Sequence, residues 1–389
     1  MQLKDLKPYL KYLFLVPLLA LAMSSLFSVR TVITCSNIFL ICSALYLLLA
    51  HEPRRPRAYV YAFFIYFIVI SASMLWTEDR EWGYVLVRRS LLLIGIPAAF
   101  YTYTFSSKQW NTIMLIFSRL TLLFIVISIV NWIIQSYRLS VSLSDFFLPY
   151  KHRISGRECW EILYSWTNYN HPTYIGYALM AALIGCLTLA KQRIVHPAEF
   201  IAQSLLCLFV LLIMQSRVGI IMCLTVIVMA VYLFLPDNKA AKGTYWVVVS
   251  GAVIAVAYIF LFRHTGFSLD NQRHRLFSDA IEQIRLSPIL GVGIGDVPAA
   301  LDDFVFRNPH NQFLGDWMQA GIPALLAILF LLGCLTFDAI RHRNYALLMF
   351  VAVSVLVMLI EMPLNLSKGI ATFTTFCCLF AEKTRDSEN

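Results

Sequence analysis

Charged residues are scarce in this sequence. Only 14% of its 389 residues are Asp, Glu, Lys or Arg, whereas 59% are hydrophobic, and the mean hydropathy is +0.71. Soluble globular domains contain about 45–50% apolar and about 25% charged residues. The composition therefore excludes an ordinary soluble domain and predicts an all-α, polytopic membrane protein, with residues 1–389 forming a single integral membrane domain.

Patterns that would indicate other classes of protein are missing as well. The nine cysteines lie mainly inside apolar runs, with Cys159 alone in an outer loop, and none belongs to a Cys-x-x-Cys pair. The sequence has no His-x-x-x-His or similar spacing, so neither a disulfide framework nor a metal site is predicted. No basic soluble module is present that would bind nucleic acid. There is no solenoid repeat and no low-complexity linker.

The apolar runs are long enough to cross a membrane, which takes about 20 residues. About twelve transmembrane helices are predicted, near residues 11–29, 32–50, 57–75, 84–105, 111–135, 172–190, 198–216, 217–235, 245–262, 312–336, 343–362 and 368–380. The first run has the basic start and apolar centre of a signal peptide. Because so many spans follow it, we expect it to remain uncleaved.

Basic residues gather in the short connections on one side of the predicted bundle. By the positive-inside rule that side is cytoplasmic, as are both termini, and anionic lipid there accounts for about half of the net charge of +9. These residues are Lys4, Lys7, Lys11, Arg54, Arg55, Arg57, Lys108, Lys191, Arg193, Lys239, Lys242, Arg341, Arg343, Lys383 and Arg385. The opposite side holds two long loops, residues 136–171 and 263–311, whose basic residues run against this rule. Either the predicted topology fails there or these charges bind an anionic ligand.

Arg88 and Arg89 lie about one turn inside the predicted span near 84–105. A charge there either reaches the outer interface or contacts an anion, such as a lipid-linked one. Arg153 and Arg157 belong to an outer loop that is rich in Trp and Tyr. Aromatic residues at a membrane face are ordinarily interfacial anchors, but aromatic faces and charged donors also bind sugars. This loop is therefore a second candidate for substrate binding.

The apolar run over residues 200–235 is too long for one span, and Gln215, Ser216 and Arg217 mark its midpoint. A tight turn at the outer face is predicted there. Arg217 either anchors this turn or directs its planar guanidinium group at phosphate, which that group can bind in a bidentate manner.

An amphipathic helix is predicted within the loop 263–311. Its apolar residues recur at helical spacing with polar residues opposite, a pattern typical of a helix that lies on the membrane face. They are Leu276, Phe277, Ala280, Ile281 and Ile284. Arg273 comes one turn before this apolar face.

The glycine-rich residues 291–295 follow no strand of a βαβ unit, so a nucleotide-binding loop is not predicted. A turn that lets the backbone approach a ligand or a neighbouring helix is sufficient. Residues 297–306 predict a second short helix. Its Asp302 and Asp303 compete with His310 for the role of general base.

His310 ends the loop and stands directly before the span near 312–336. By position alone it is an interfacial residue or a helix cap. Asn311 follows it, and Gly321 comes after nine further residues. Eleven residues is close to three helical turns, which predicts Gly321 beneath His310 on one helix face, where glycine lets another helix approach closely. This spacing resembles the His-Asn-x9-Gly signature of bacterial O-antigen ligases and the related O-antigen polymerase-type membrane proteins.

The resemblance extends to two other places in the chain. Ser216-Arg217-Val218-Gly219 is similar to the segment that follows the corresponding span of the ligases. Arg273, then a helix, then Ser287-Pro288 are similar in order and distance, with Arg275 as the alternative to Arg273. The family often repeats its glycine three residues later, where this chain has Ala324.

The resemblance implies a GT-C-type glycosyltransferase that moves O-antigen from undecaprenyl pyrophosphate onto lipid A-core oligosaccharide, at the periplasmic face of the bacterial inner membrane. Arg217 and Arg273 would bind the pyrophosphate. His310, kept neutral by the positive end of the following helix dipole, would be the general base, and Asn311 would orient its ring or a sugar hydroxyl. Direct displacement would invert the anomeric configuration, with no metal and no other cofactor.

Two other functions remain open from the sequence. An O-antigen polymerase uses the same donor but a second lipid-linked glycan as acceptor, and residue types do not separate it from a ligase. A polysaccharide flippase or other transporter would line a path through the membrane with charged groups. The charges identified here gather at one face, which favours an enzyme.

Overall fold

The structure is a computed structural model that describes residues 3–50, 57–147, 153–154, 157–167, 171–236, 238–245, 247, 271–301 and 308–383. For residues 3–8, 153–154 and 271–274 only the backbone is described. Within these ranges the regular structure is helical apart from one hairpin of two short antiparallel strands, β1 (Arg153–Ile154) and β2 (Arg157–Glu158). The predicted all-α class is therefore confirmed.

The helices follow the apolar runs of the sequence. Their bounds are α1 Leu3–Ser24, α2 Val29–Ala50, α3 Ala58–Ala72, α4 Arg80–Ser90, α5 Leu92–Tyr101, α6 Ser107–Arg138, α7 Cys159–Leu163, α8 Pro172–Lys191, α9 Pro197–Ile213, α10 Arg217–Phe234, α12 Asn271–Leu286, α13 Val297–Ala300, α14 Gln312–Arg341, α15 Tyr345–Met358 and α16 Ser367–Glu382. Short 3-10 helices cover η1 Ser73–Leu75, η2 Leu143–Phe147, η3 Ser165–Thr167 and η4 Pro363–Asn365.

Seven helical segments in the described part of the chain are long and apolar enough to cross a membrane. They are Val29–Ala50, Ala58–Leu75, Arg80–Tyr101, Ser107–Arg138, Pro172–Lys191, Arg217–Phe234 and Gln312–Arg341, and the shorter apolar helices are Tyr9–Ser24, Pro197–Ile213 and Tyr345–Met358. The protein is thus a polytopic membrane protein. The predicted number of about twelve spans is not confirmed. Residues 248–262 of one predicted span lie outside the described residues, and α16 belongs to neither group.

The centre of the bundle is formed by α8 and α16, which are buried along almost their whole length. Both are rich in Gly, Ala, Ser and Thr, and small residues let helices pack closely in a membrane. At Gly176 of α8, an added Cβ atom would lie 3.5 Å from the Cα atom of Gly219 on α10. By contrast, α2 exposes a row of large apolar residues, among them Ile38, Ile41 and Leu48. Such a face suits contact with lipid.

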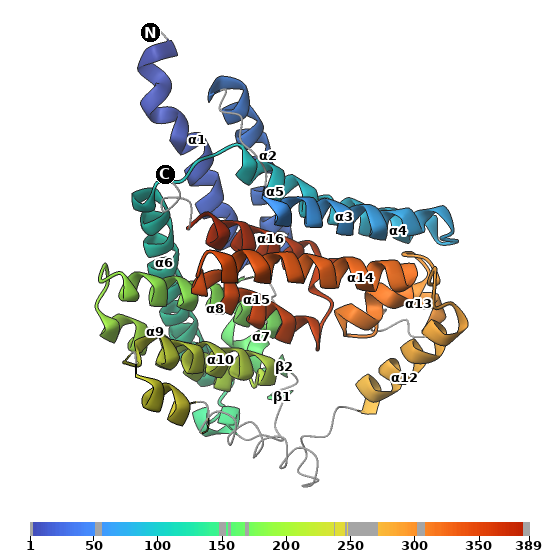
Figure 1. Ribbon diagram of the computed structural model, residues 1–389. Coiled ribbons are helices and arrows are strands. Elements are labelled where there is room, and N and C mark those ends of the chain that lie inside the picture. Colours follow the sequence, from blue (N-terminus) through green and yellow to red (C-terminus); the bar gives the residue numbers. More distant parts are fainter. Residues whose placement is uncertain are drawn as a thin grey trace.

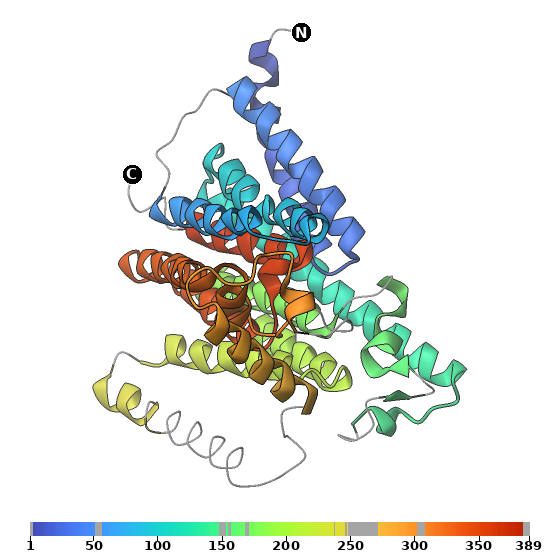
Figure 2. The ribbon, with the colours of Figure 1, turned by 90° about the vertical axis from the view of Figure 1, so that its right-hand side faces the viewer.

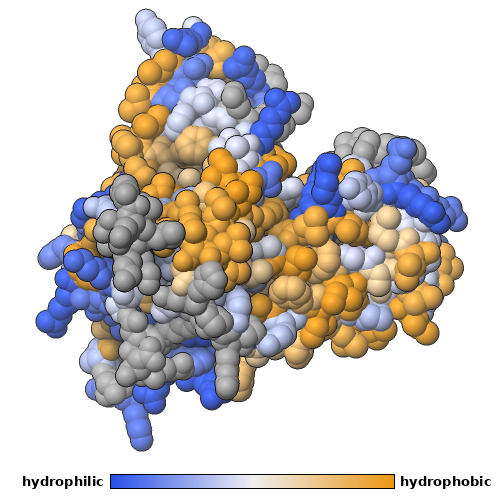
Figure 3. Space-filling view, turned by 90° about the horizontal axis from the view of Figure 1, so that it is seen from above, coloured by the Kyte–Doolittle hydropathy of each residue, from blue (hydrophilic) through white to orange (hydrophobic). Residues whose placement is uncertain are grey.

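The longer helices form stacked layers (Figure 1). α3 and α4 run along one side of α14, which also packs on α15, while α9 and α10 lie beneath α8. α1 and α2 pack on each other and project from the rest of the molecule in both Figure 1 and Figure 2. Hydrophobic side chains cover much of the surface seen from above in Figure 3.

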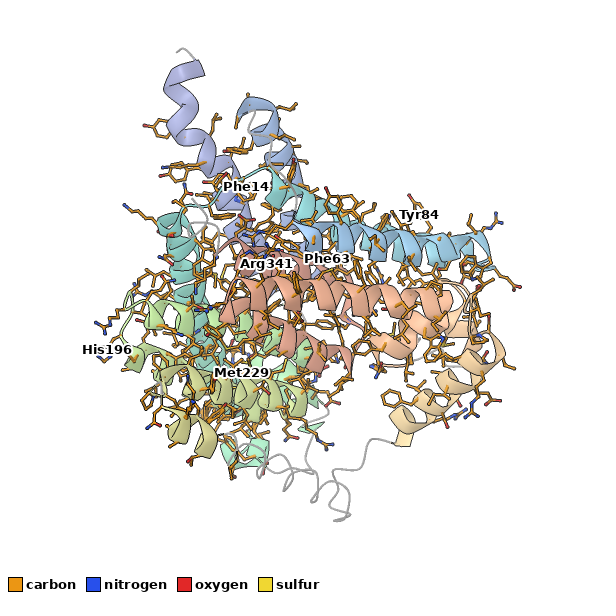
Figure 4. All side chains as sticks on the ribbon, in the orientation of Figure 1. Phe14, Phe63, Tyr84, His196, Met229 and Arg341 are labelled. Carbon is orange, nitrogen blue, oxygen red and sulfur yellow. The ribbon has the colours of Figure 1, made fainter. Side chains whose placement is uncertain are left out.

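Basic helix ends gather at one end of these layers. Arg57, just before α3, donates from Nη1 to the Asp338 carboxylate at 3.2 Å and to the Ala381 carbonyl at 2.9 Å. Asn344, at the start of α15, donates to the Phe380 carbonyl at 2.7 Å. Figure 4 shows Arg341 at the end of α14 that lies farthest from α12 and α13. The starts of α8, α14 and α16 and the end of α15 therefore meet at the opposite end.

α14 is interrupted, and the predicted straight helix face from His310 to Gly321 is wrong. Ala320 (φ −136°, ψ 22°) and Gly321 (φ 70°, ψ −166°) are not helical. Pro323 explains the interruption because it has no N–H to donate to the Gln319 carbonyl four residues earlier. A Cβ atom at Gly321 would collide with the Ile289 carbonyl. The close approach is thus made by the backbone of a turn and not, as predicted, by another helix.

This turn replaces the missing helical hydrogen bonds. Val292 N donates to the Met318 carbonyl at 2.8 Å, Gly293 N donates to the Gln319 carbonyl at 3.0 Å, and Ile322 N donates to the Pro288 carbonyl at 3.1 Å. At its far end, the Asp296 carboxylate accepts from the backbone N–H groups of residues 78 and 79 at 2.9 and 2.8 Å. The glycine-rich segment therefore joins α14 to the α3–α4 connection, as its composition allowed.

The predicted amphipathic helix is present as α12. Its Leu276, Ala280 and Ile284 are buried in a cluster with Val297, Leu301 and Met318, so the apolar face packs on α13 and α14. Ile281 is 43% exposed, so not every apolar residue of the predicted face is covered. α13 supplies the start of the second predicted helix, and Asp302 and Asp303 lie outside the described residues.

Candidate active site

His310 lies beside Glu361. The His310 Nδ1 and Glu361 Oε2 atoms are 3.0 Å apart, and the two side chains are 14% and 7% exposed. An ionised carboxylate can only accept, so in a neutral imidazole this contact places the proton on Nδ1 and the lone pair on Nε2. A histidine oriented in this way by a carboxylate can act as a general base.

The segment before α14 presents His310 in an unusual backbone conformation. Its φ angle is +49°, in the left-handed region that residues with a side chain rarely adopt. The side chain of Asn308 helps to hold it there, because Asn308 Oδ1 accepts from the His310 N–H at 2.9 Å. Backbone strain of this kind is frequent at functional sites.

Asn311 joins two helices through its side-chain amide. Its Oδ1 atom caps α14 by accepting from Leu314 N at 3.0 Å, and its Nδ2 atom donates to the Leu359 carbonyl at 3.1 Å. The amide therefore ties the start of α14 to the end of α15. This contact holds the segments that carry His310 and Glu361 near each other, and the role of Asn311 in orienting the ring or a sugar hydroxyl stays a prediction.

Glu361 was not identified from the sequence. It follows α15, a helix without charged residues, and is 5% exposed. An acidic residue next to a membrane span is costly unless it is paired or faces a polar cavity, and this is the signal that the sequence offered. Nothing in the spacing of residues indicates that its partner is His310.

A buried polar network supports the turn that follows Glu361. Gln312 Oε1 accepts from Leu364 N at 2.9 Å, and Gln312 Nε2 donates to the Asp316 carboxylate at 2.7 Å. The Tyr66 hydroxyl donates to the other Asp316 oxygen at 2.9 Å. Fully paired buried networks make a structure rigid. This one fixes α3, α14 and the residues after α15 relative to one another.

A cavity of about 250 Å³ lies next to the pair and is lined by Glu361, Asn308, Gln319 and Arg89, among others. Arg89 reaches it from α4, where its guanidinium carbon is 5.3 Å from the centre of the Trp82 ring. Its Nη1 atom is 3.5 Å from the Asn365 carbonyl. A cation and a buried carboxylate thus face one small cavity.

A second cavity, of about 690 Å³, adjoins the first, because Arg89, Tyr174 and Leu366 line both. Its further polar lining includes Arg88, His171, Ser36 and Lys368, and its apolar lining includes Val29, Ile33 and Leu92. Lys368 is 3% exposed, and its Nζ donates to the Phe27 carbonyl at 2.9 Å. Apolar walls beside several cations suit an amphiphile with an anionic head.

The tight turn predicted at Gln215–Arg217 is confirmed. α9 ends at Ile213, Gln215 has a φ angle of +53°, and Ser216 caps α10 by accepting from Gly219 N at 3.2 Å. Arg217 is the first residue of α10, is exposed, and lines neither cavity.

Two of the remaining predicted arginines, Arg157 and Arg275, line neither cavity, and the side chains of the other two lie outside the described residues. Arg275 lies on α12 and is 3.7 Å from the carboxylate of Asp279 on the same helix. Arg273 is in α12 and Arg153 in β1, but their side chains lie outside the described residues. Arg157, in β2, is exposed. Of the predicted cations, Arg89 lines the smaller cavity together with Glu361 and also lines the larger one, whereas Arg88 lines only the larger one.

Residues 202–329 match a family described as O-antigen ligase. The match covers about a third of the chain and supports a relationship to the O-antigen ligase family. The predicted resemblance is thereby confirmed, at a level that covers membrane glycosyltransferase-like activity in O-antigen assembly but does not separate ligase from polymerase. A comparison with curated proteins finds no match.

The O-antigen ligase match contains only part of the candidate site. His310, Gln319 and Gly321 lie within it, whereas Glu361 and Arg89 lie outside. The histidine and the break in α14 thus lie within the matched residues, whereas the cavity cation Arg89 lies on α4 before them and Glu361 lies in the connection after α15.

Proposed function

We propose that this protein is a membrane glycosyltransferase that moves a glycan from undecaprenyl pyrophosphate to lipid A-core oligosaccharide, at the periplasmic face of the inner membrane. The observation that carries the proposal is the His310–Glu361 pair beside a small cavity that continues into a cation-lined, apolar one. Membrane lipids, the lipid-linked donor and the lipid A-core acceptor are the expected partners.

The reaction begins with the acceptor hydroxyl. Its oxygen attacks the anomeric carbon of the donor while His310 Nε2 takes its proton, and Glu361 stabilises the imidazolium that forms. The bond from the anomeric carbon to the pyrophosphate oxygen breaks, and the electron pair leaves with the pyrophosphate. A single displacement of this kind inverts the anomeric configuration.

Cations stabilise the charge that grows on the leaving pyrophosphate. Arg89 is suited to this role because it lines both cavities, and Arg88 and Lys368 line the larger one. Fixed positive groups at a developing negative charge are among the strongest catalytic effects. Roles for Arg217 and Arg273 on the pyrophosphate stay predictions, as does the independence from metal ions.

The distribution of charge supports a periplasmic site. The basic ends of α3, α14 and α16 gather at one end through contacts such as Arg57 to Asp338, and the positive-inside rule assigns such an end to the cytoplasm. His310 and Glu361 lie at the other ends of α14 and α15, which would then face the periplasm.

The experiment is transfer by purified protein. Native protein, His310→Ala and Arg89→Gln proteins are mixed with undecaprenyl-pyrophosphate glycan and lipid A-core, with a chelator present. Transfer to lipid A-core by native protein, together with its loss in the His310→Ala protein, is the expected result, and Arg89→Gln is expected to lower the rate roughly hundredfold. Longer lipid-linked glycans with none on lipid A-core would identify a polymerase. Movement of glycan across the membrane without any new glycosidic bond would identify a transporter.

A further inference from the structure

Two buried polar groups face the smaller cavity without a hydrogen-bond partner. The Tyr174 hydroxyl and the Gln319 side-chain oxygen have none among the described residues, although the residues are only 4% and 1% exposed. Buried polar groups in proteins are nearly always hydrogen-bonded. Both residues line the cavity beside Glu361, so a ligand there would supply the missing partners.

Gln319 is held in place by the break in α14. Its backbone carbonyl accepts from Gly293 N at 3.0 Å, and the next two residues are the non-helical Ala320 and Gly321. The side chain is therefore positioned by the turn 288–293 and not by an ordinary helical neighbour. Rigid support of this kind is what a binding residue requires.

Tyr174 lies at the junction of the two cavities. It is in the first turn of α8, its ring centre is 5.7 Å from that of His171, and it lines both cavities together with Arg89 and Leu366. A group bound at this junction has a cation on one side. Beyond it, the larger cavity leads along apolar Val29, Ile33 and Leu92, and the smaller cavity leads to Glu361.

We propose that Tyr174 and Gln319 bind the sugar that is attached directly to the pyrophosphate of the donor, and that they select this sugar by its polar substituents. The proposal rests on the proposed function. With the pyrophosphate at Arg89, the isoprenoid chain lies in the larger cavity and the first sugar lies in the cavity of about 250 Å³. That volume is about eight times the roughly 30 Å³ share of one water, which is room for one sugar ring.

The chemistry of the two groups defines what they recognise. The Gln319 oxygen accepts from a sugar O–H or from the N–H of an N-acetyl group, and the Tyr174 hydroxyl both donates and accepts. A site built to hydrogen-bond a substrate group rejects analogues that lack it, because its own buried groups are then left unpaired. Tyr174 and Gln319 therefore determine which sugar is bound and do not take part in removing the proton of the acceptor hydroxyl.

Binding of two kinds of probe separates sugar contacts from pyrophosphate contacts. One probe is undecaprenyl pyrophosphate, and the others are the same lipid carrying one N-acetylglucosamine, one N-acetylgalactosamine or one galactose. Full-length protein is compared with Tyr174→Phe and Gln319→Leu proteins. We expect each substitution to weaken binding of the preferred sugar-bearing probe roughly tenfold to hundredfold and to leave binding of undecaprenyl pyrophosphate unchanged.

Tyr164→Phe is the matched control. The Tyr164 hydroxyl is also without a partner in the described part of the chain, and Tyr164 is 1% exposed, but it lines neither cavity. The Tyr164→Phe protein should bind every probe as the native protein does. If Gln319→Leu does not give folded protein, Gln319→Asn moves the oxygen by one methylene group and addresses the same question.

The proposal is overturned if native protein binds no sugar-bearing probe more tightly than undecaprenyl pyrophosphate. It is also overturned if Tyr174→Phe and Gln319→Leu proteins bind all probes like the native protein. These outcomes are distinct from failure of the proposed function, in which native protein forms no glycosidic bond. His310→Ala is expected to retain the binding of every probe while losing transfer.

Discussion

His310 and Glu361 come from two connections that are 51 positions apart in the chain. The histidine could be predicted because it ends a polar loop and stands before an apolar run with a recognisable spacing to Gly321. The carboxylate could not, because the sequence shows where a charge lies along a span but not which residue faces it. The basic residues Arg217 and Arg275 illustrate the same limit, since one lies at a helix start and the other pairs within its own helix.

Replacing Glu361 with Gln tests the pair. The substitution keeps the size of the side chain but removes the negative charge that stabilises protonated His310, so we expect kcat to fall roughly 10²- to 10⁴-fold with little change in KM. Steady-state transfer assays give both constants. Glu199→Gln is the matched control, because Glu199 pairs with Arg119 at 3.4 Å on the surface and such pairs contribute little. If the Glu361→Gln protein had an unchanged kcat, Glu361 would not assist His310 in catalysis.

At the scale of elements, apolar runs and turn residues determined most of what could be predicted. The Gln215–Arg217 turn followed from a run too long for one span, and α12 followed from the spacing of Leu276, Ala280 and Ile284. The break in α14 was missed because the distance from His310 to Gly321 was read as three regular turns. Pro323 was the opposing signal, since it removes a helical donor two residues after Gly321.

Gly321→Ala tests the break. Alanine would have to adopt a φ angle of +70° and place its Cβ against the Ile289 carbonyl, so we expect a loss of stability of about 1–3 kcal/mol or more and detachment of the turn 288–293. Thermal unfolding in detergent measures the first effect. Gly333→Ala, on the same helix, has no atom within 4 Å of the added Cβ and should be neutral or more stable by up to about 1 kcal/mol. Equal unfolding temperatures for the two variants would contradict this account.

At the scale of the whole molecule, the alternation of helix directions separates a basic end from an end that carries the candidate site. Composition was sufficient to predict a polytopic membrane protein, and the orientation expected from the basic connections stays a prediction. Neither indicated that α8 and α16 are enclosed by the other helices, because burial on all sides and exposure to lipid both favour apolar residues.

The orientation can be tested with a thiol reagent that does not cross membranes. Arg80 begins α4 near the candidate site, Gln192 directly follows α8 at the basic end, and both are exposed. In spheroplasts, Arg80→Cys is expected to react at once and Gln192→Cys only after lysis, each compared with the unsubstituted protein. The reverse order would put His310 and Glu361 on the cytoplasmic side and remove the periplasmic reaction from consideration.

The boundaries of the family match have a practical consequence for building hybrid proteins. In a chimera that exchanges only residues 202–329 between two relatives, the residue at position 310 would come from one protein and its carboxylate partner at position 361 from the other. To keep the site intact, the α3–α4 connection and the segment from α15 to the start of α16 would have to be exchanged together with these residues. We therefore expect donor and acceptor preferences to be determined jointly by residues from distant parts of the chain, so that exchanging one segment does not transfer them.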